Sequence, residues 1–506
     1  MGSQPHSLVA KALSSVRWTA AATATNVGFN LGYTAIMARL LTPAAFGLVA
    51  MAQIAIRILG YFAKLGIMPA LVQKPDLSER DIRAALTLSV FVNVLLFGLM
   101  WLLAPLAGAF FDSAPVVPIL RGLAVMFVFS GFSAVSIGLL RRRLMFRQLA
   151  VLEIVSYIFG YGVVGITAAL ADMGAWSLVY ATIGQEAVMV IIGYAYTRHS
   201  LRPTLSREAL SHFLRFGTQY SVIGFLEYIG SNVDSIIVGR WFGEAQLGIY
   251  SRALLLVKLP SYHVGTSINK VLFPVLSSAQ HDKEKLAGAY LVGWVLVGSL
   301  AGAISISLIP AADDLVLTLL GEQWLAAVPI VQIAAFAVPF DFLTQVSGIL
   351  CDAQGLLRPK LRIQFATLTI VAIAMYFLLP HGVVGIATAM VIAEGCRLAM
   401  YFTLHARRLP LCMHDFARAN VAVLFITGVS ATCVWSAAVA TASWGFEPWW
   451  SVLFEAIAGA FGLAFSAATA WLWLRTIPAF VRLRASLPLV SRIESVYPRW
   501  LLRGAA

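Results

Sequence analysis

Long apolar segments follow one another along this chain, and short polar loops separate them. A helix needs about 20 mostly apolar residues to cross a bilayer, so each segment of roughly that length is a candidate span. The pattern predicts fourteen spans: residues 15–38, 44–64, 84–110, 116–138, 148–171, 174–197, 216–239, 245–269, 287–309, 325–350, 362–380, 383–405, 417–440 and 449–474. We therefore expect an all-α polytopic membrane protein with about 14 transmembrane helices.

The loops between these spans alternate in charge. Loops on one side hold most basic residues: Lys64, Lys74, Arg80, Arg83, Arg141, Arg142, Arg143, Arg147, Arg198, Arg202, Arg207, Arg215, Lys270, Lys283, Lys285, Arg358, Lys360, Arg362, Arg407, Arg408 and Arg418. Loops on the other side carry almost only acids: Asp112, Asp172, Asp313, Asp314, Glu322 and Glu447. Because basic loops face the cytoplasm, we expect both termini on the cytoplasmic side.

Composition supports the membrane assignment and argues against other classes. The chain is 60% hydrophobic and 12% charged, whereas soluble domains average about 25% charged residues. Its net charge of +13 resides mostly in short loops, which favours a topological signal over binding to nucleic acid. The four cysteines lack metal-ligand spacing, and the chain has no Gly-x-x-x-x-Gly-Lys phosphate loop. We expect no metal site, no catalytic residue and no nucleic-acid partner.

An internal repeat is the most informative pattern in the chain. Residues 39–47 align without a gap with residues 240–248, an offset of 201. The same offset relates Arg57 to Lys258. Each half of the chain thus places a cation at one depth in a membrane span, which is typical of a transporter with an anionic cargo.

A second repeated motif defines the domain organisation. Residues 138–144 resemble residues 355–361 at an offset of 217, and loop-length differences account for the change. Six spans return the chain to its starting side, so spans 1–6 and 7–12 are predicted to form two parallel-repeat lobes. The predicted domains are an N-terminal lobe (1–200), a C-terminal lobe (201–410), an appended pair of spans (411–475) and a basic cytoplasmic tail (476–506).

Three cations inside the spans are candidate substrate-binding residues. An ionised side chain at the bilayer centre costs about 2.5–3.5 kcal/mol on insertion scales, so each needs a partner, water or a purpose. Arg57, Arg252 and Lys258 are expected to line a cationic cavity between the lobes. The alternative is that these side chains extend to the inner headgroups or pair with carboxylates.

Four further charged residues are candidate charge partners or ion-coupling groups. Glu227 and Asp234 lie seven residues apart and so share a helical face. They either neutralise the cations or carry a coupling H+ or Na+. Glu394 and Arg397 lie one turn apart and are expected to pair within their own helix. Asp341 has no partner that the sequence reveals.

Short motifs resemble a known family of membrane transporters. The segment Ala38-Arg-Leu-Leu-Thr-Pro-Ala-Ala-Phe-Gly47 is one, and Asn232-Val-Asp-Ser-Ile-Ile-Val-Gly-Arg240 with Leu247-Gly-Ile-Tyr250 is another. The chain resembles the polysaccharide transporter, or oligosaccharide flippase, family of the multidrug/oligosaccharidyl-lipid/polysaccharide exporter superfamily. The colanic-acid-exporter branch is the most similar, and the resemblance covers residues from about 10 to 410.

The resemblance implies a location, a substrate and a mechanism. The location is the bacterial cytoplasmic (inner) membrane, and the substrate is an undecaprenyl-diphosphate-linked oligosaccharide for exopolysaccharide, capsule or O-antigen assembly. Such a protein turns its cargo from the inner to the outer leaflet by alternating access around a basic central cavity. Arg57 and Arg252 fall on the second and eighth spans, where related flippases place cavity cations. The implied partners are membrane lipids, a polysaccharide polymerase and chain-length machinery.

Three alternatives remain at this point. Fourteen spans also resemble a peptidoglycan-precursor flippase, whereas many oligosaccharide flippases have twelve. A multidrug/cation antiporter would favour an acidic cavity over the paired cations. A membrane polysaccharide polymerase or ligase usually carries a large outer loop with catalytic residues, and the longest outer loop here is about residues 310–324. We therefore expect a transporter and not an enzyme.

Overall fold

The chain is an all-α polytopic membrane protein. A computed structural model describes residues 28–63, 71, 72, 74, 76–204, 207–410 and 412–474, which form helices and no strands. The long helices are α2 (Pro43–Ala63), α4 (Glu79–Phe111), α5 (Val116–Arg142), α6 (Phe146–Tyr157), α8 (Ala175–Thr197), α9 (Arg207–Ser278), α10 (Lys283–Leu308), α12 (Val328–Ala353), α13 (Leu357–Leu378), α14 (Gly382–Ala406), α15 (Met413–Trp444) and α16 (Pro448–Leu474). Short elements are the π-helix η1 (Ile158–Gly165), α7 (Ile166–Leu170), α11 (Ala312–Leu319), η2 (Glu322–Ala327) and η3 (Leu379–His381).

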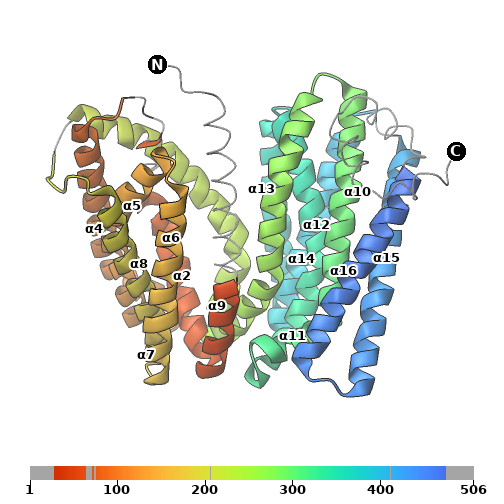
Figure 1. Cartoon of the computed structure of the whole chain (residues 1–506), viewed down its shortest axis with the longest axis horizontal. Helices are drawn as coiled ribbons and strands as arrows, with labels where there is room; N and C mark the ends of the chain where they lie inside the picture. The colour runs from red at the N-terminus through yellow and green to blue at the C-terminus, as the bar shows by residue number, and fades with distance from the viewer. Residues whose placement is uncertain are drawn as a thin grey trace. The chain divides into compact units, whose positions relative to one another are not determined.

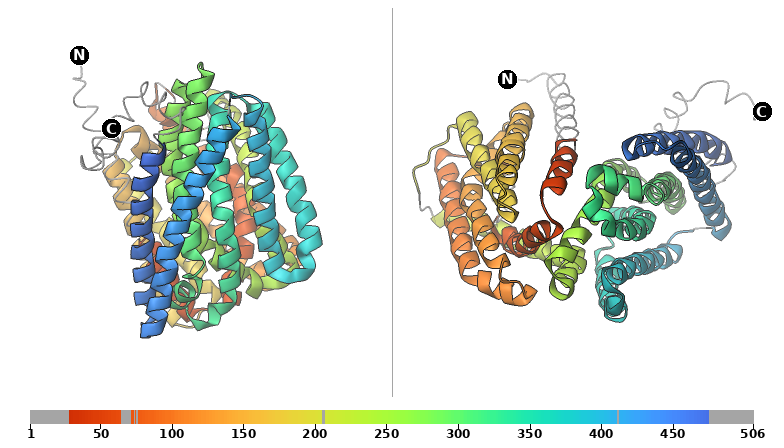
Figure 2. Two further views of the ribbon diagram at one scale, coloured as in Figure 1. Left: turned by 90° about the vertical axis from the view of Figure 1, so that its right-hand side faces the viewer. Right: turned by 90° about the horizontal axis from the view of Figure 1, so that it is seen from below.

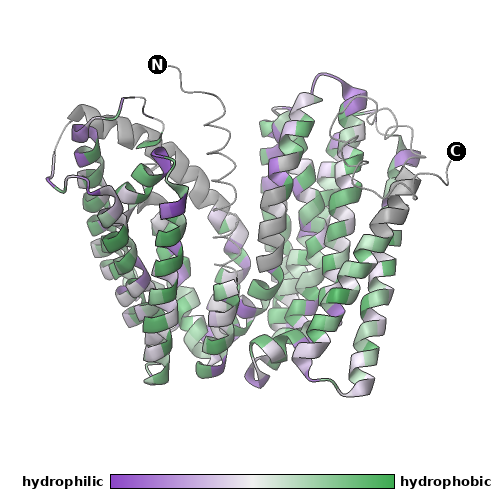
Figure 3. Ribbon diagram, in the orientation of Figure 1, coloured by the Kyte–Doolittle hydropathy of each residue, from purple (hydrophilic) through white to green (hydrophobic). Residues whose placement is uncertain are grey.

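The helices follow the predicted spans closely. Ten helical stretches among the described residues are long and apolar enough to cross a membrane, and one of them, Leu357–Ala406, contains both α13 and α14. Hydrophobic residues cover most of the length of these helices (Figure 3). Span 15–38 begins outside the described residues, and its described part belongs to a helix over residues 28–40.

Predicted spans seven and eight are both contained in α9. This helix is interrupted at Gly243, whose φ of 78° and ψ of −177° are not helical. Glycine adopts such a positive φ without steric cost. The predicted loop between the two spans is therefore a sharp break at one glycine.

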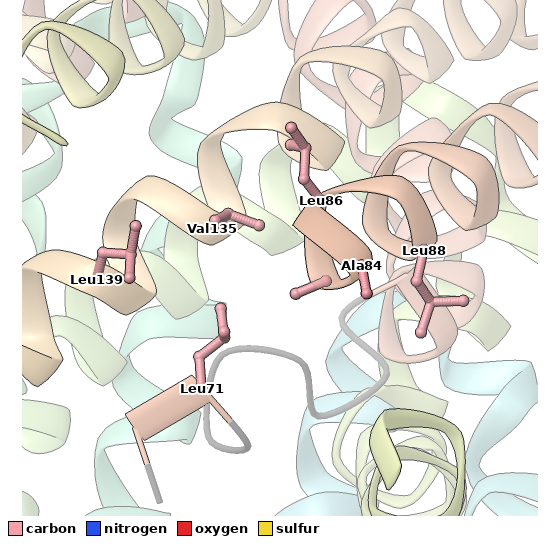
Figure 4. Close-up of a cluster of buried hydrophobic side chains, with 7 residues drawn as sticks. Leu71, Ala84, Leu86, Leu88, Val135 and Leu139 are labelled. Carbon is pink, nitrogen blue, oxygen red and sulfur yellow. The ribbon is translucent and has the colours of Figure 1, made fainter. Parts of the chain in front are cut away.

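The start of α4 shows how local sequence sets a helix end. Ser78 and Asp81 form a capping box: the Asp81 N–H donates to Ser78 Oγ at 3.2 Å, and the Ser78 N–H donates to Asp81 Oδ2 at 3.0 Å. Both bonds satisfy backbone donors that the helix itself cannot pair. Residues Leu71, Ala84, Leu86, Leu88, Val135 and Leu139 form a buried apolar cluster around this end of α4 (Figure 4).

The described chain divides into two compact units. Unit 1 comprises residues 1–251 and 319–324, and unit 2 comprises residues 252–318 and 325–506. The division falls inside α9. The lobes that the repeat defines, 1–200 and 201–410, stay a prediction.

Unit 1 is built around α5. This helix packs against α2, α4 and α8, and η1 packs along α8. The close approach of η1 to α8 depends on Gly160, because a Cβ there would lie 2.4 Å from the Gln185 backbone nitrogen. The helices of the unit run side by side (Figure 1).

Unit 2 is built around α10 and α12. Helix α10 contacts α12, α15 and α16, while α14 contacts α12 and α13. Small residues bring the helices together, as is usual in membrane bundles. A Cβ at Gly302 would overlap the Thr427 side chain, so α10 and α15 are in close contact there. Two further views show the same side-by-side packing of helices within each unit (Figure 2).

Candidate functional site

Residues 43–60 of α2 are buried or half-buried, and Arg57 is the one exception. Met51 and Ala52 are 0% exposed, and Ile54 and Ile56 are also buried. Arg57 is exposed at the next position. A charge that the protein leaves uncovered within a membrane-spanning helix must meet water, a lipid headgroup or a ligand.

The repeat-equivalent part of α9 shares part of this burial pattern. Leu256 and Val257 are buried, and Lys258 is exposed directly after them. Ser251, seven residues before Lys258, is half-buried, as is Ala50, seven residues before Arg57. The two cations are therefore exposed at repeat-equivalent positions, each directly after a buried residue.

The same two helices meet at repeat-equivalent glycines. A Cβ at Gly47 would overlap the carbonyl group of Glu244, and a Cβ at Gly248 would overlap the carbonyl oxygen of Pro43. Glu244 is the repeat equivalent of Pro43, as Gly248 is of Gly47. The contact is thus reciprocal, and it lies wholly within unit 1.

This contact gives each cation a reference point on its own helix. Arg57 follows Gly47 by ten residues, and Lys258 follows Gly248 by ten residues. At 1.5 Å per residue, each cation lies about 15 Å from the glycine contact along its helix. Neither cation makes a hydrogen bond or salt bridge with any other described residue.

The remaining residues predicted on α9 have different surroundings. Arg252 is half-buried. Asp234 is 1% exposed, and its Oδ2 accepts a hydrogen bond of 2.9 Å from the hydroxyl of Tyr250. This bond connects the two parts of α9 on either side of Gly243, so Asp234 contributes to the fold of that break. The side chain of Glu227 lies outside the described residues.

Unit 2 contains a charged cluster on α12 and α14. The predicted pair is present: Arg397 Nη2 lies 2.6 Å from Glu394 Oε2. The same nitrogen lies 3.4 Å from Asp341 Oδ1 on α12. Gln345 Nε2 donates to the other oxygen of Asp341 at 3.1 Å. Asp341, for which the sequence revealed no partner, is thus part of the Arg397 cluster.

Lys258 lies close enough to this cluster to interact electrostatically with Glu394. Gln345 also approaches α9, because a Cβ at Gly265 would lie 2.6 Å from Gln345 Oε1. Of the predicted residues, the structure therefore brings together Glu394 and Arg397, with Lys258 within electrostatic range of Glu394, and it adds Asp341 and Gln345. Arg57 belongs to unit 1, and the cavity between the lobes stays a prediction.

The sequence alone did not place Asp341 and Gln345 in the site, and their spacing was the one signal for it. Asp341 and Gln345 lie four residues apart and so share a face of α12. Their connection to α14 depends on which helices pack together, and hydropathy does not encode that. Among the described residues, no group of three or more His, Cys, Asp or Glu side chains could hold a metal ion.

Comparison with known proteins gives a family and a fold. The family described as "Polysaccharide biosynthesis protein" matches residues 36–329. The teichuronic acid biosynthesis protein TuaB of Bacillus subtilis is 25% identical over 58% of this chain and 60% of that protein. The succinoglycan biosynthesis transport protein ExoT of Rhizobium meliloti is 27% identical over 64% of this chain and 65% of that protein. The chain thus spans less than two thirds of either relative.

The fold is similar to that of a solved transporter. The lipid II flippase MurJ, in an inward closed conformation, aligns over 91% of this chain and 99% of its own, with a TM-score of 0.68 and 13% identity. At that identity the similarity concerns the fold alone.

Proposed function

Because this chain belongs to the polysaccharide biosynthesis protein family, we propose that it is a flippase for an undecaprenyl-diphosphate-linked oligosaccharide. The cargo moves from the inner to the outer leaflet of the bacterial cytoplasmic membrane. The observation that carries this proposal is the exposed cation that both repeats place at the same position, Arg57 on α2 and Lys258 on α9.

The chemistry of the cargo explains why cations are needed. A diphosphate cannot enter hydrocarbon without losing its hydration, and the cost of such a transfer is large unless the charge is paired. Arg57 and Arg252 can each donate two parallel hydrogen bonds to phosphate oxygens, whereas Lys258 acts as a mobile point charge. Each of the three cations would bind phosphate oxygens of the cargo while the isoprenoid chain stays in lipid.

The internal repeat suits alternating access. Parallel repeats commonly move against each other around a fixed binding site. The names of the two relatives refer to different polymers, teichuronic acid and succinoglycan. A site that recognises the diphosphate, common to all lipid-linked precursors, would serve such varied cargoes. Such a site does not specify the sugar of the cargo.

We further propose that the Arg397 cluster couples transport to H+ or Na+. Two carboxylates, Asp341 and Glu394, surround one guanidinium, so the three groups carry one excess negative charge when ionised. A proton or a sodium ion would neutralise that excess. The electrostatic interaction of Lys258 with Glu394 would link this neutralisation to the cationic residues.

Leaflet transfer in proteoliposomes tests the function. Purified protein is reconstituted with a fluorescent lipid-diphosphate oligosaccharide, and its transfer is compared among wild type, Arg57→Ala and Lys258→Ala. Loss of one charge-assisted phosphate contact of about 1.5–3 kcal/mol reduces transfer by roughly 10- to 100-fold. Lys285→Ala is the matched control, since Lys285 pairs with Asp282 at the start of α10. Unchanged transfer in both test variants would remove the proposed site.

A further inference from the structure

Three connections that are far apart in sequence meet within unit 1. The first surrounds residues 38–47, the second surrounds residues 240–248, and the third is the segment 319–324. The first two meet at the reciprocal glycine contact of Gly47 and Gly248. Because backbone touches backbone there, the contact leaves no room for any side chain.

The third connection is held on the first by hydrogen bonds and packing. Trp324 Nε1 donates to the carbonyl of Ala38 at 2.8 Å, and Gln323 Nε2 donates to the carbonyls of Ala38 and Leu41. The Trp324 ring is 0% exposed and lies edge-on to Phe46, with ring centroids 5.4 Å apart. Residues 319–324 thus cover the start of α2 from a position about 280 residues later in the chain.

The hydrogen bonds that Gln323 and Trp324 make to the carbonyls of Ala38 and Leu41 can break and re-form at low cost. The helix over residues 28–40 ends two residues after Ala38, so the Ala38 carbonyl and that of Leu41, just past the end, have no donor within that helix. Gln323 and Trp324 supply donors in their place. At a membrane surface, water can take over both acceptors when the segment leaves, which keeps the cost of opening low.

All these segments lie at one end of the helices of unit 1. Helix α4 ends at Phe111, and the Phe111 ring contacts the Gly239 position just before the break in α9. Helix α2 begins at Pro43 at the same contact site. By the charge pattern of the loops, this is the outer end of the protein.

We propose that residues 319–324 and the Gly47–Gly248 contact form an outer latch, closed in this structure, which opens to release cargo to the outer leaflet. The latch rests on the proposed function, because it assigns these contacts to the outward step of transport. Gly321 forms the turn of this segment with a φ of 100°, a conformation that is strained for any other residue. The latch joins both repeats, so both must separate there when it opens.

A reversible chemical bridge tests the latch. In a chain whose four cysteines are replaced by alanine, Arg39→Cys and Glu322→Cys are joined by a short bis-methanethiosulfonate. Both positions are exposed, and the neighbouring Gly321 Cβ position lies 3.7 Å from Arg39 Cγ. Bridging should reduce leaflet transfer by about tenfold or more, and a reducing agent should restore it. Equal rates of leaflet transfer with and without the bridge would contradict the proposed latch.

A control bridge and a labelling measurement test the latch independently of cargo transfer. Asp352→Cys with Lys360→Cys replaces a 2.6 Å ion pair between α12 and α13 in unit 2, and bridging there should leave transfer unchanged. Phe46→Cys, buried beneath Trp324, reports opening without cargo through its reaction with an impermeant maleimide. The Arg39–Glu322 bridge should slow this labelling by about tenfold, and an equal labelling rate would contradict the latch even where the cargo proves different.

Discussion

Arg57 and Arg397 both lie in apolar helices, yet their surroundings differ. Arg397 on α14 is held by Glu394 at 2.6 Å and Asp341 at 3.4 Å. Arg57 on α2 is exposed and makes no salt bridge with any residue that the structure describes. The fold thus pairs one guanidinium with two carboxylates and leaves the other exposed, without a salt bridge to a described residue.

The difference teaches how to separate structural charges from functional ones. A half-buried ion pair such as Arg397–Glu394 holds its partners in place, so removing one member leaves an uncompensated charge. An exposed cation repeated at the same position in two halves contributes little to stability and needs an external explanation. Stability and transport measurements should therefore sort these residues into two groups.

The largest expected effect is on stability, at Arg397. Arg397→Ala leaves the half-buried Asp341 and Glu394 without a cation, which should lower the free energy of unfolding by about 2–3 kcal/mol, somewhat less than for a fully buried pair. Arg57→Ala should change it by less than about 0.5 kcal/mol, because Arg57 has no described partner to lose. Thermal unfolding in detergent compares the two. Equal destabilisation would abolish the distinction.

A rescue experiment sharpens that result. Asp341→Asn and Glu394→Gln remove the stranded charges with little change in shape, so adding both to Arg397→Ala should recover most of the lost stability. Absence of any recovery would mean that Arg397 stabilises α14 by packing instead of charge.

The next effect is on transport, at Lys258. Lys258→Glu reverses the charge within electrostatic range of Glu394, so leaflet transfer should decrease by roughly 100-fold. Lys258→Arg keeps the charge and should retain most of the activity. The unfolding temperature of the arginine variant should stay close to that of wild type. Equal transfer by the glutamate and arginine variants would show that the cargo does not need positive charge there.

The arrangement of spans was largely predictable from hydropathy. Segment 116–138 corresponds to α5 (Val116–Arg142), and segment 449–474 corresponds to α16 (Pro448–Leu474). Such agreement follows from bilayer thickness, which requires each helix to contain a long apolar stretch. The break between predicted spans seven and eight was also expected, although the loop is a single non-helical residue, Gly243.

The site was predictable only where partners lie close in sequence. The Glu394–Arg397 pair follows from helical spacing alone, and it is present. Asp341 joins that pair from another helix, 56 residues away. Asp234 bonds to Tyr250 across the break in α9, and Trp324 bonds to Ala38 over 286 residues. These contacts depend on helix packing, which the composition of a single helix does not reveal.

His199 shows a third way in which this fold treats an ionisable group, and the smallest effect is expected there. It lies just after α8, is 7% exposed, and its Nδ1 lies 2.9 Å from the hydroxyl of Thr197. Burial, together with the positive charge of Arg143, lowers the pKa of His199 below its ordinary value of 6.5. With no carboxylate among the causes of this shift, folding favours the neutral form of His199, whereas Arg397 pairs with carboxylates.

The lowered pKa of His199 determines how the stability of the protein changes with pH. The unfolded chain takes up a proton at His199 near pH 6.5, while the folded chain resists it. The contribution of neutral His199 to the free energy of unfolding is therefore fully present above pH 6.5. It decreases as the pH falls through 6.5 toward the lower pKa of the folded state. Between pH 7.5 and about 5, the unfolding temperature of wild type should decrease more than that of His199→Gln, whose side chain cannot titrate. The same pH dependence in both proteins would place the acid-sensitive group elsewhere and leave His199 as an ordinary hydrogen-bonding residue.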